Sequence, residues 1–169
     1  MKNIAIITLL AALLIACADE QNSGFNFKEF WAEFYAQKAA WESLNIDHYR
    51  FTLISPPNTS NPLLSTPPLT MTIFPDREPE ITLIDRLPAT PELIEEFGIT
   101  RVPTIEASFA NIEARVKDNS NSPHFAGYDV IYNKNYHFPE YSGVRWKQGT
   151  NGALGASRIR DFEDLRKNR

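Results

Sequence analysis

The chain has little cysteine and histidine, which limits the metal and redox chemistry open to it. Among its 169 residues there is one cysteine, Cys17, and there are three histidines. A single thiol forms no intrachain disulfide and leaves no cysteine-rich metal site. The histidines also lack the close pairing along a helix that many zinc sites use. We therefore expect no metal and no cofactor.

An excess of positive charge is also missing, because the formal net charge is −4. Proteins that bind nucleic acid neutralise phosphates with lysine and arginine, so we expect no nucleic-acid partner. The residues are 43% hydrophobic and 22% charged, which is ordinary globular composition. That composition excludes collagen, a multi-span membrane protein and a wholly disordered chain, and the length is that of one domain.

Recognisable catalytic motifs are absent as well. The chain contains no nucleophile elbow, phosphate-binding loop or dinucleotide fingerprint, and its glycine-rich stretch 149–155 lacks the Lys-Ser/Thr pair that a phosphate-binding loop needs. The enzymatic alternative is a hydrolase with a nonstandard carboxylate/histidine site. That alternative requires convergence of at least two of four side chains: Asp76, His124, Asp129 and His137.

The one long apolar run lies at the N-terminus. Residues 4–16 are apolar except for Thr8, and Lys2 precedes them. A bilayer-spanning helix needs about 20 apolar residues. This shorter run has the length of a signal-peptide core, about 7–15 residues. It ends in Leu14-Ile15-Ala16-Cys17, which resembles the lipobox of bacterial lipoproteins. The alternatives are an ordinary secretory signal with a chance cysteine and a buried apolar helix.

We therefore predict a lipoprotein signal peptide over 1–16, a lipidated Cys17 with a tether over 17–24, and one domain over 25–169. Each buried CH₂ of the lipid contributes about 0.8 kcal/mol, so two or three acyl chains hold the protein firmly to the membrane. The expected location is the bacterial cell envelope. Ala18, rather than aspartate, follows the cysteine, which favours the outer membrane in a bacterium with two membranes.

The rest of the chain alternates between helical and strand patterns. Apolar residues at spacings of three and four predict a long helix over 25–45 and a second helix over 104–117 with Thr104 as its N-cap. A short helix is expected over 91–97, and five prolines make 55–68 a loop. The expected strands are 48–54, 69–74, 80–84, 128–133 and 140–148, with an edge strand or a helical turn over 157–165.

This order predicts an α+β fold. The long N-terminal helix and the second helix are expected to pack on one face of a mainly antiparallel sheet. The strands over 69–74 and 80–84 are separated by a Pro-Asp-Arg-Glu-Pro turn, so they are expected to form a hairpin.

Three blocks of sequence resemble an uncharacterised family of bacterial secreted and lipoprotein domains, known only as a domain of unknown function. They are 41–53 (WESLNIDHYRFTL), 103–112 (PTIEASFANI) and 132–139 (YNKNYHFP). The resemblance spans about residues 27–165 and implies a fold and an envelope location, but no reaction. The chain differs from many relatives in having Ile54-Ser55-Pro56-Pro57 where they carry a cysteine pair, and His137 where they carry glycine.

Aromatic residues crowd the hairpin predicted near residues 128–148. Aromatic side chains with polar tips are enriched at binding surfaces, although strand packing produces the same pattern. We therefore expect a non-enzymatic module that binds an envelope protein or a small ligand, or that has a structural role through an exposed aromatic face of the helix over 25–45. The candidate binding residues are Tyr132, Tyr136, Phe138, Tyr141 and Trp146.

The lipid anchor gives a direct prediction. Cys17→Ser removes the only sulfur that can accept the diacylglyceryl group, so acyl labelling and membrane fractionation should both be lost. Labelling with a radioactive or clickable fatty acid, followed by detergent partitioning, measures both. Unchanged partitioning of the Cys17→Ser protein would contradict the prediction.

Overall fold

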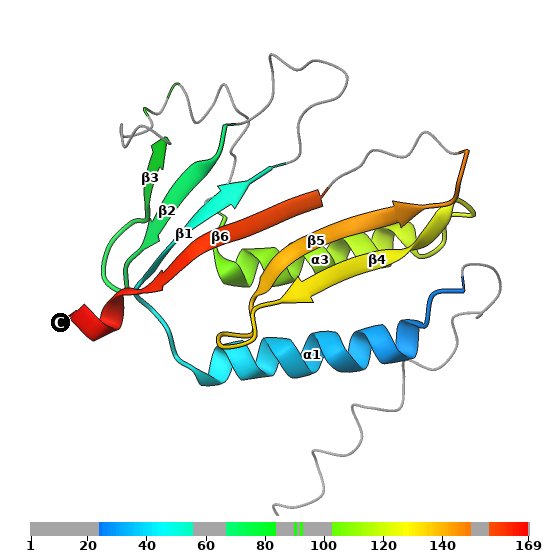
Figure 1. The fold of residues 1–169 in the computed structure, drawn as a ribbon, viewed down its shortest axis with the longest axis horizontal. Helices are drawn as coiled ribbons and strands as arrows, with labels where there is room; N and C mark the ends of the chain where they lie inside the picture. Colours follow the sequence, from blue (N-terminus) through cyan, green and yellow to red (C-terminus); the bar gives the residue numbers. More distant parts are fainter. Residues whose placement is uncertain are drawn as a thin grey trace, which may run out of the picture.

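The computed structural model describes residues 24–55, 67–83, 90, 92, 103–149 and 156–168 (Figure 1). The predicted signal peptide, Cys17, most of the loop 55–68 and nearly all of the helix predicted over 91–97 lie outside these residues. The elements in chain order are α1 (Phe27–Ser43), β1 (Tyr49–Ile54), β2 (Leu69–Ile73), β3 (Glu80–Leu83), α3 (Ile105–Asn119), β4 (Phe125–Tyr132), β5 (Pro139–Trp146), β6 (Ala156–Asp164) and the 3-10 helix η3 (Leu165–Asn168).

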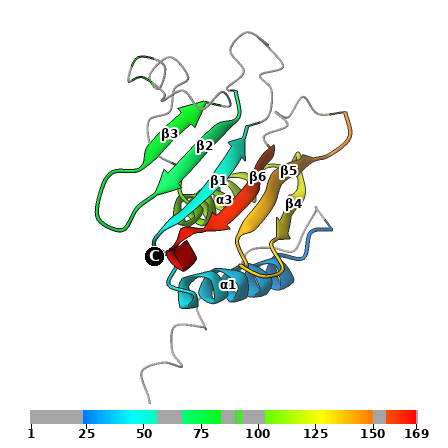
Figure 2. The same ribbon diagram turned by 60° about the vertical axis from the view of Figure 1, so that its left-hand side comes forward.

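The strands form one six-stranded antiparallel sheet in the order β3-β2-β1-β6-β5-β4. The predicted hairpin of β2 and β3 is confirmed, with Met71 opposite Ile81. The segment 157–165 was expected to form either an edge strand or a helical turn. The edge position is wrong, because β6 pairs with β1 on one side and with β5 on the other. β3 and β4 are therefore the two outer strands of the described sheet (Figure 2).

The two faces of the sheet differ in polarity because side chains alternate along each strand. α1 and α3 lie on the apolar face, where Phe34 of α1 packs its ring on Phe109 of α3 and Phe30 packs on Tyr128 of β4. The opposite face is polar, and no helix among the described residues covers it (Figure 2). The buried residues that the strands contribute to the core are Tyr49, Phe51, Leu69, Met71, Ile81, Phe125, Tyr128, Val144 and Ile159, and Phe138 joins them from the β4–β5 turn.

A bulge keeps the apolar side of β6 in register. Ile159 and Phe162 are three residues apart, so plain alternation would place them on opposite faces. The pairing with β1 shifts between Arg160 and Glu163, and Asp161 adopts a left-handed backbone with φ 53°. The extra residue lets Phe162 join Ile159 on the helix-facing side, where its ring lies 5.9 Å from that of Trp41.

The prediction of a long N-terminal helix over 25–45 is wrong, because α1 covers only Phe27–Ser43, which is 17 residues. Asn26 caps its start by accepting a hydrogen bond from the backbone N–H of Glu29, and Leu44 is its C-cap. Asn45 then adopts a left-handed backbone with φ 48°, which ends the helix. The apolar pattern runs past both caps because Phe25 and Leu44 pack on the core from outside the helix.

The second helix matches its prediction closely. α3 begins after Thr104, whose side chain accepts from the backbone N–H of Ala107, as expected for the N-cap. Its four inward residues at spacings of four, three and four are all buried: Ile105, Phe109, Ile112 and Val116.

A single carboxylate joins α1, β1 and α3. Glu106, in the first turn of α3, accepts hydrogen bonds from the indole N–H of Trp41 at 2.9 Å and from the hydroxyl of Tyr49 at 3.0 Å. The Tyr49 hydroxyl oxygen in turn accepts from the backbone N–H of Ile105 at 3.3 Å. Every polar atom of the two buried rings is therefore satisfied, and the start of α3 is held against the sheet.

A residue near the C-terminus of the chain, Arg166, also holds the C-terminal end of α1. Arg166 contacts the carboxylate of Asp164, which is buried, through Nε at 3.0 Å and Nη2 at 2.9 Å. Its Nη1 also donates to the backbone carbonyls of Leu44 and Asn45, both at 2.8 Å. A guanidinium in this place satisfies carbonyls that the end of a helix leaves unpaired.

The β4–β5 turn has the geometry that glycine favours. His137 in this turn has φ 64°, a left-handed backbone that glycine adopts most readily. Its Nδ1 lies 2.9 Å from Oε1 of Gln37 on α1, so the imidazole is held by a contact that glycine could not make.

The hydrogen bonds that join Trp41, Tyr49, Ile105 and Glu106 form a junction whose loss should destabilise the protein. Tyr49→Phe removes the hydroxyl and leaves the buried backbone N–H of Ile105 without its acceptor, which should lower the free energy of unfolding by about 1–3 kcal/mol. Urea unfolding measures this as a lower midpoint at an unchanged slope. Tyr141→Phe is the matched control, because no described residue hydrogen-bonds its hydroxyl. Equal midpoints for the two variants would contradict the role of the junction.

Candidate binding groove

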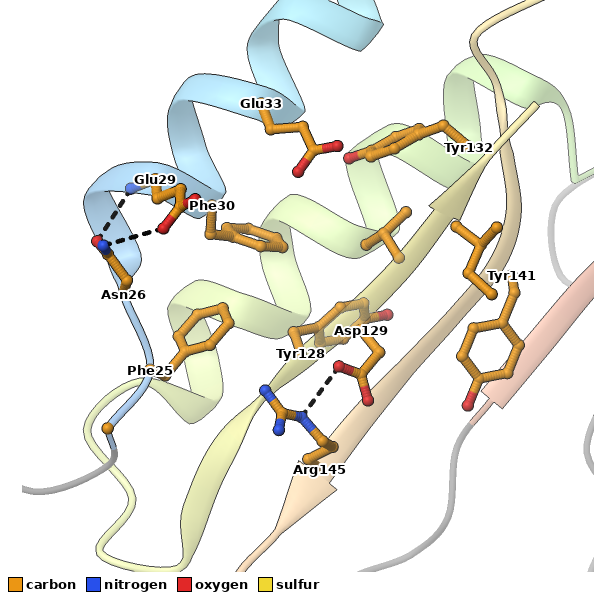
Figure 3. Close-up of a pocket in the computed structure, with 13 residues that line it drawn as sticks. Phe25, Asn26, Glu29, Phe30, Glu33, Tyr128, Asp129, Tyr132, Tyr141 and Arg145 are labelled. Carbon is orange, nitrogen blue, oxygen red and sulfur yellow. Dashed lines mark hydrogen bonds and ion pairs between the residues drawn. The ribbon is translucent and has the colours of Figure 1, made fainter. Parts of the chain in front are cut away.

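A groove of about 580 Å³ runs between the N-terminal half of α1 and the outer strand β4 (Figure 3). Two separate elements build it together, and its volume is in the usual range for ligand sites, about 300–1,000 Å³. Its lining residues are Gly24, Phe25, Asn26, Glu29, Phe30, Glu33, Tyr128, Asp129, Val130, Ile131, Tyr132, Tyr141 and Arg145.

The groove follows the free edge of the sheet. β4 pairs with β5 on one side, and no other described strand pairs with its outer side. Alternation along β4 turns Tyr128, Val130 and Tyr132 toward the helices. It turns Asp129 and Ile131 toward the open face, and the cross-strand partner of Ile131 is Tyr141. The groove therefore reaches both sides of one strand.

Phe25, just before α1, forms one end of the groove. Its ring lies 5.2 Å from that of Phe30 and 5.7 Å from that of Phe125. It also lies directly over Gly127 of β4, where an added Cβ would come within 2.8 Å of the Phe25 ring and 2.7 Å of Arg145 Nη2. Gly127 has φ 145°, so only glycine meets both the backbone and the space requirements there.

The lining carries more negative than positive charge. Asp129 and Arg145 form an ion pair across the strands with 3.0 Å between Oδ1 and Nε (Figure 3). Glu29 accepts a hydrogen bond from the side-chain amide of Asn26 at 3.1 Å. Glu33 lies one turn further along α1, and no described residue forms a hydrogen bond or ion pair with its carboxylate. The three carboxylates and one guanidinium leave a negative site.

Tyr132 is held in its neutral form. Burial raises the pKa of its hydroxyl well above the ordinary value, and the negative charge of Glu33 and the neighbouring Tyr128 raise it further. The ring stacks on Phe109 of α3 with 6.5 Å between centroids. The hydroxyl is therefore a proton donor at the groove and does not act as a base at neutral pH.

The structure divides the five aromatic residues proposed from the sequence. Tyr132 and Tyr141 line the groove. Phe138 is 1% exposed and packs in the core, and the ring of Tyr136 lies 4.7 Å from that of Phe162. Trp146 packs edge-on against Phe125. Phe138 is therefore a core residue, and Tyr136 and Trp146 are partly buried against the core.

Sequence reasoning missed Phe25, Glu33 and Ile131 as groove residues. No local signal marks them, because they come together only when α1 lies beside β4. The exposed aromatic face proposed for the helix over 25–45 is wrong for Trp41, which is 3% exposed. Trp31 is half-buried and packs edge-on against Phe34.

The four residues of the hydrolase alternative lie in four different segments. Asp76 is in the β2–β3 turn, His124 precedes β4, Asp129 is within β4, and His137 is in the β4–β5 turn. Only Asp129 lines the groove, and it is paired with Arg145. Within the described ranges, no group of three or more His, Cys, Asp and Glu residues could hold a metal ion.

The chain matches no protein-family model, and no curated protein or solved structure shows significant similarity to it. The resemblance drawn from the three sequence blocks therefore stays a prediction. No described helix combines the length and the apolar character needed to span a bilayer.

The raised pKa of Tyr132 predicts that the protein loses stability at high pH. Above about pH 10 the unfolded chain releases the Tyr132 proton while the folded protein keeps it, so the free energy of unfolding falls as pH rises. Tyr132→Phe should reduce this fall by up to about 1.4 kcal/mol per pH unit. Urea midpoints between pH 9 and pH 11 measure the slope.

Ser142→Ala serves as the control for that slope, because serine does not titrate in this range while its side chain is also buried in the sheet. Its curve should run parallel to that of the wild type. A Tyr132→Phe curve that is also parallel to the wild type would refute the expected shift.

Proposed function

We propose that this protein is a lipid-anchored, non-enzymatic binding module of the bacterial envelope, whose groove takes an extended segment of a partner protein. The observation that carries the proposal is the position of the groove along the unpaired side of β4. An outer strand presents unpaired N–H and C=O groups, and an extended peptide satisfies them by adding a strand.

The side chains of the groove support a peptide ligand. Ile131, which is 58% exposed, is one of two large hydrophobic residues that the described surface leaves exposed. It lies opposite Tyr141 on the open face, while Tyr128 and Tyr132 lie on the helix-facing side. An added strand would meet Ile131 on the open face and Tyr132 on the helix-facing side, and tyrosine offers apolar area together with a polar tip.

The predicted anchor supports a site near the membrane. Gly24 lines the groove, and Cys17 precedes it by seven residues. A fully extended chain spans at most about 3.6 Å per residue, so a lipid on Cys17 would hold this end of the groove within about 25 Å of the anchor. The partner segment would then belong to another envelope protein.

The alternative function, a hydrolase with a nonstandard carboxylate/histidine site, gains no support from the described geometry. Acid–base catalysis needs its groups within reach of one substrate atom. Only Asp129 among the four candidate residues lies in the groove.

Binding of selected peptides tests the proposal. Octapeptides are selected from a random library on the full chain in detergent, and their affinities are measured by fluorescence anisotropy. Ile131→Ser removes an apolar side chain that the peptide would cover, and burying such a side chain contributes about 1.5 kcal/mol. The variant should therefore bind the selected peptides about tenfold more weakly.

Tyr35→Ser is the matched control, because Tyr35 is the other large side chain exposed in the described structure, at 41%, and it lies outside the groove. It should bind the peptides as the wild type does. Failure to select any peptide, or an equal loss in both variants, would overturn the proposed function.

A further inference from the structure

Glu33 is placed to receive a positive charge. It is exposed on α1, it lines the groove, and no described residue pairs with it. Figure 3 shows its carboxylate and the hydroxyl end of Tyr132 directed toward one another. The other two lining carboxylates already have partners, Asn26 for Glu29 and Arg145 for Asp129.

Aromatic rings lie beside this carboxylate. Phe30 is on the same helix, with its ring 6.3 Å from that of Tyr128, and Tyr132 lies four residues after Tyr128 on the same side of β4. A lysine ammonium or arginine guanidinium is attracted both to a carboxylate and to the faces of aromatic rings. The apolar stem of such a side chain packs well against rings while its charged end reaches an acceptor.

The two sides of β4 differ in the charge they offer. On the helix-facing side, Glu33 lies next to Tyr132. On the open-face side, Asp129 and Arg145 neutralise each other, and Ile131 presents an apolar surface. Because side chains alternate along a strand, an added strand would turn every second residue toward Glu33 and the others toward Ile131.

We infer that the groove selects an extended segment in which basic and apolar residues alternate, with a lysine or arginine held by Glu33 between the rings of Phe30 and Tyr132. This inference rests on the proposed function and adds the chemistry of the partner. The net negative lining gives the same preference at longer range, since a cationic segment is attracted before it docks.

Three blocked octapeptides test the charge preference. They alternate valine with lysine, glutamine or glutamate, carry an acetylated N-terminus and an amidated C-terminus, and are titrated onto the full chain in detergent. We expect the lysine peptide to bind at least tenfold more tightly than the glutamine peptide at low salt. The glutamate peptide should bind most weakly, and the difference should shrink as salt is added.

Two variants locate the preference. Glu33→Gln should remove most of the difference in affinity between the lysine and glutamine peptides. Glu42→Gln removes the same charge from α1 outside the groove and should leave the difference intact. An equal effect of the two substitutions would show a preference for net charge alone and would overturn the role of Glu33.

The outcomes separate the two proposals. If the lysine and glutamine peptides bind the wild type equally and Ile131→Ser weakens both, the groove binds extended segments and the charge preference is wrong. If none of the three peptides binds and the random library also yields none, the proposed function fails together with the inference.

Discussion

The arrangement of the molecule depends on the carboxylate of Glu106, which accepts hydrogen bonds from Trp41 of α1 and Tyr49 of β1. A folded protein loses stability when a buried indole N–H or phenol O–H has no acceptor, so this one side chain ties α1 and α3 to the sheet. Arg166 adds a second attachment by donating to the carbonyls at the end of α1. With its C-terminal end held in these two ways, α1 extends toward β4, where the groove forms.

The groove exists because α1 lies beside the outer strand without pairing to it. A helix cannot satisfy the backbone groups of a strand edge, so the outer side of β4 has no strand partner among the described residues. Phe25 packs over Gly127 at one end, and Glu33 and Tyr132 face each other further along α1. The segment that leads to the predicted lipid anchor enters the domain at this same place. Binding and anchoring are thus proposed for neighbouring parts of the surface.

Local signals in the sequence predicted the elements that depend on neighbouring residues. The cap at Thr104 and the four buried residues of α3 lie within a few turns of one helix, and the β2–β3 hairpin depends on its own short turn. The ends of α1 were misjudged because Phe25 and Leu44 continue the apolar pattern outside the helix. The position of β6 was missed because its partners, β1 and β5, come from distant parts of the chain, and its bulge at Asp161 serves that pairing.

By itself, the sequence determined that this chain has no intrachain disulfide, that it combines helices with antiparallel strands, and where α3 begins. These properties follow from composition, periodicity and hydrogen bonds between near neighbours. Only the tertiary structure decided which aromatic residues are in the core and which line a groove, since Phe138 and Tyr132 occupy one hairpin yet differ in surroundings. It also decided that β4 is an outer strand beside Glu33. Strand order arises from contacts between distant segments, which no short stretch of sequence contains.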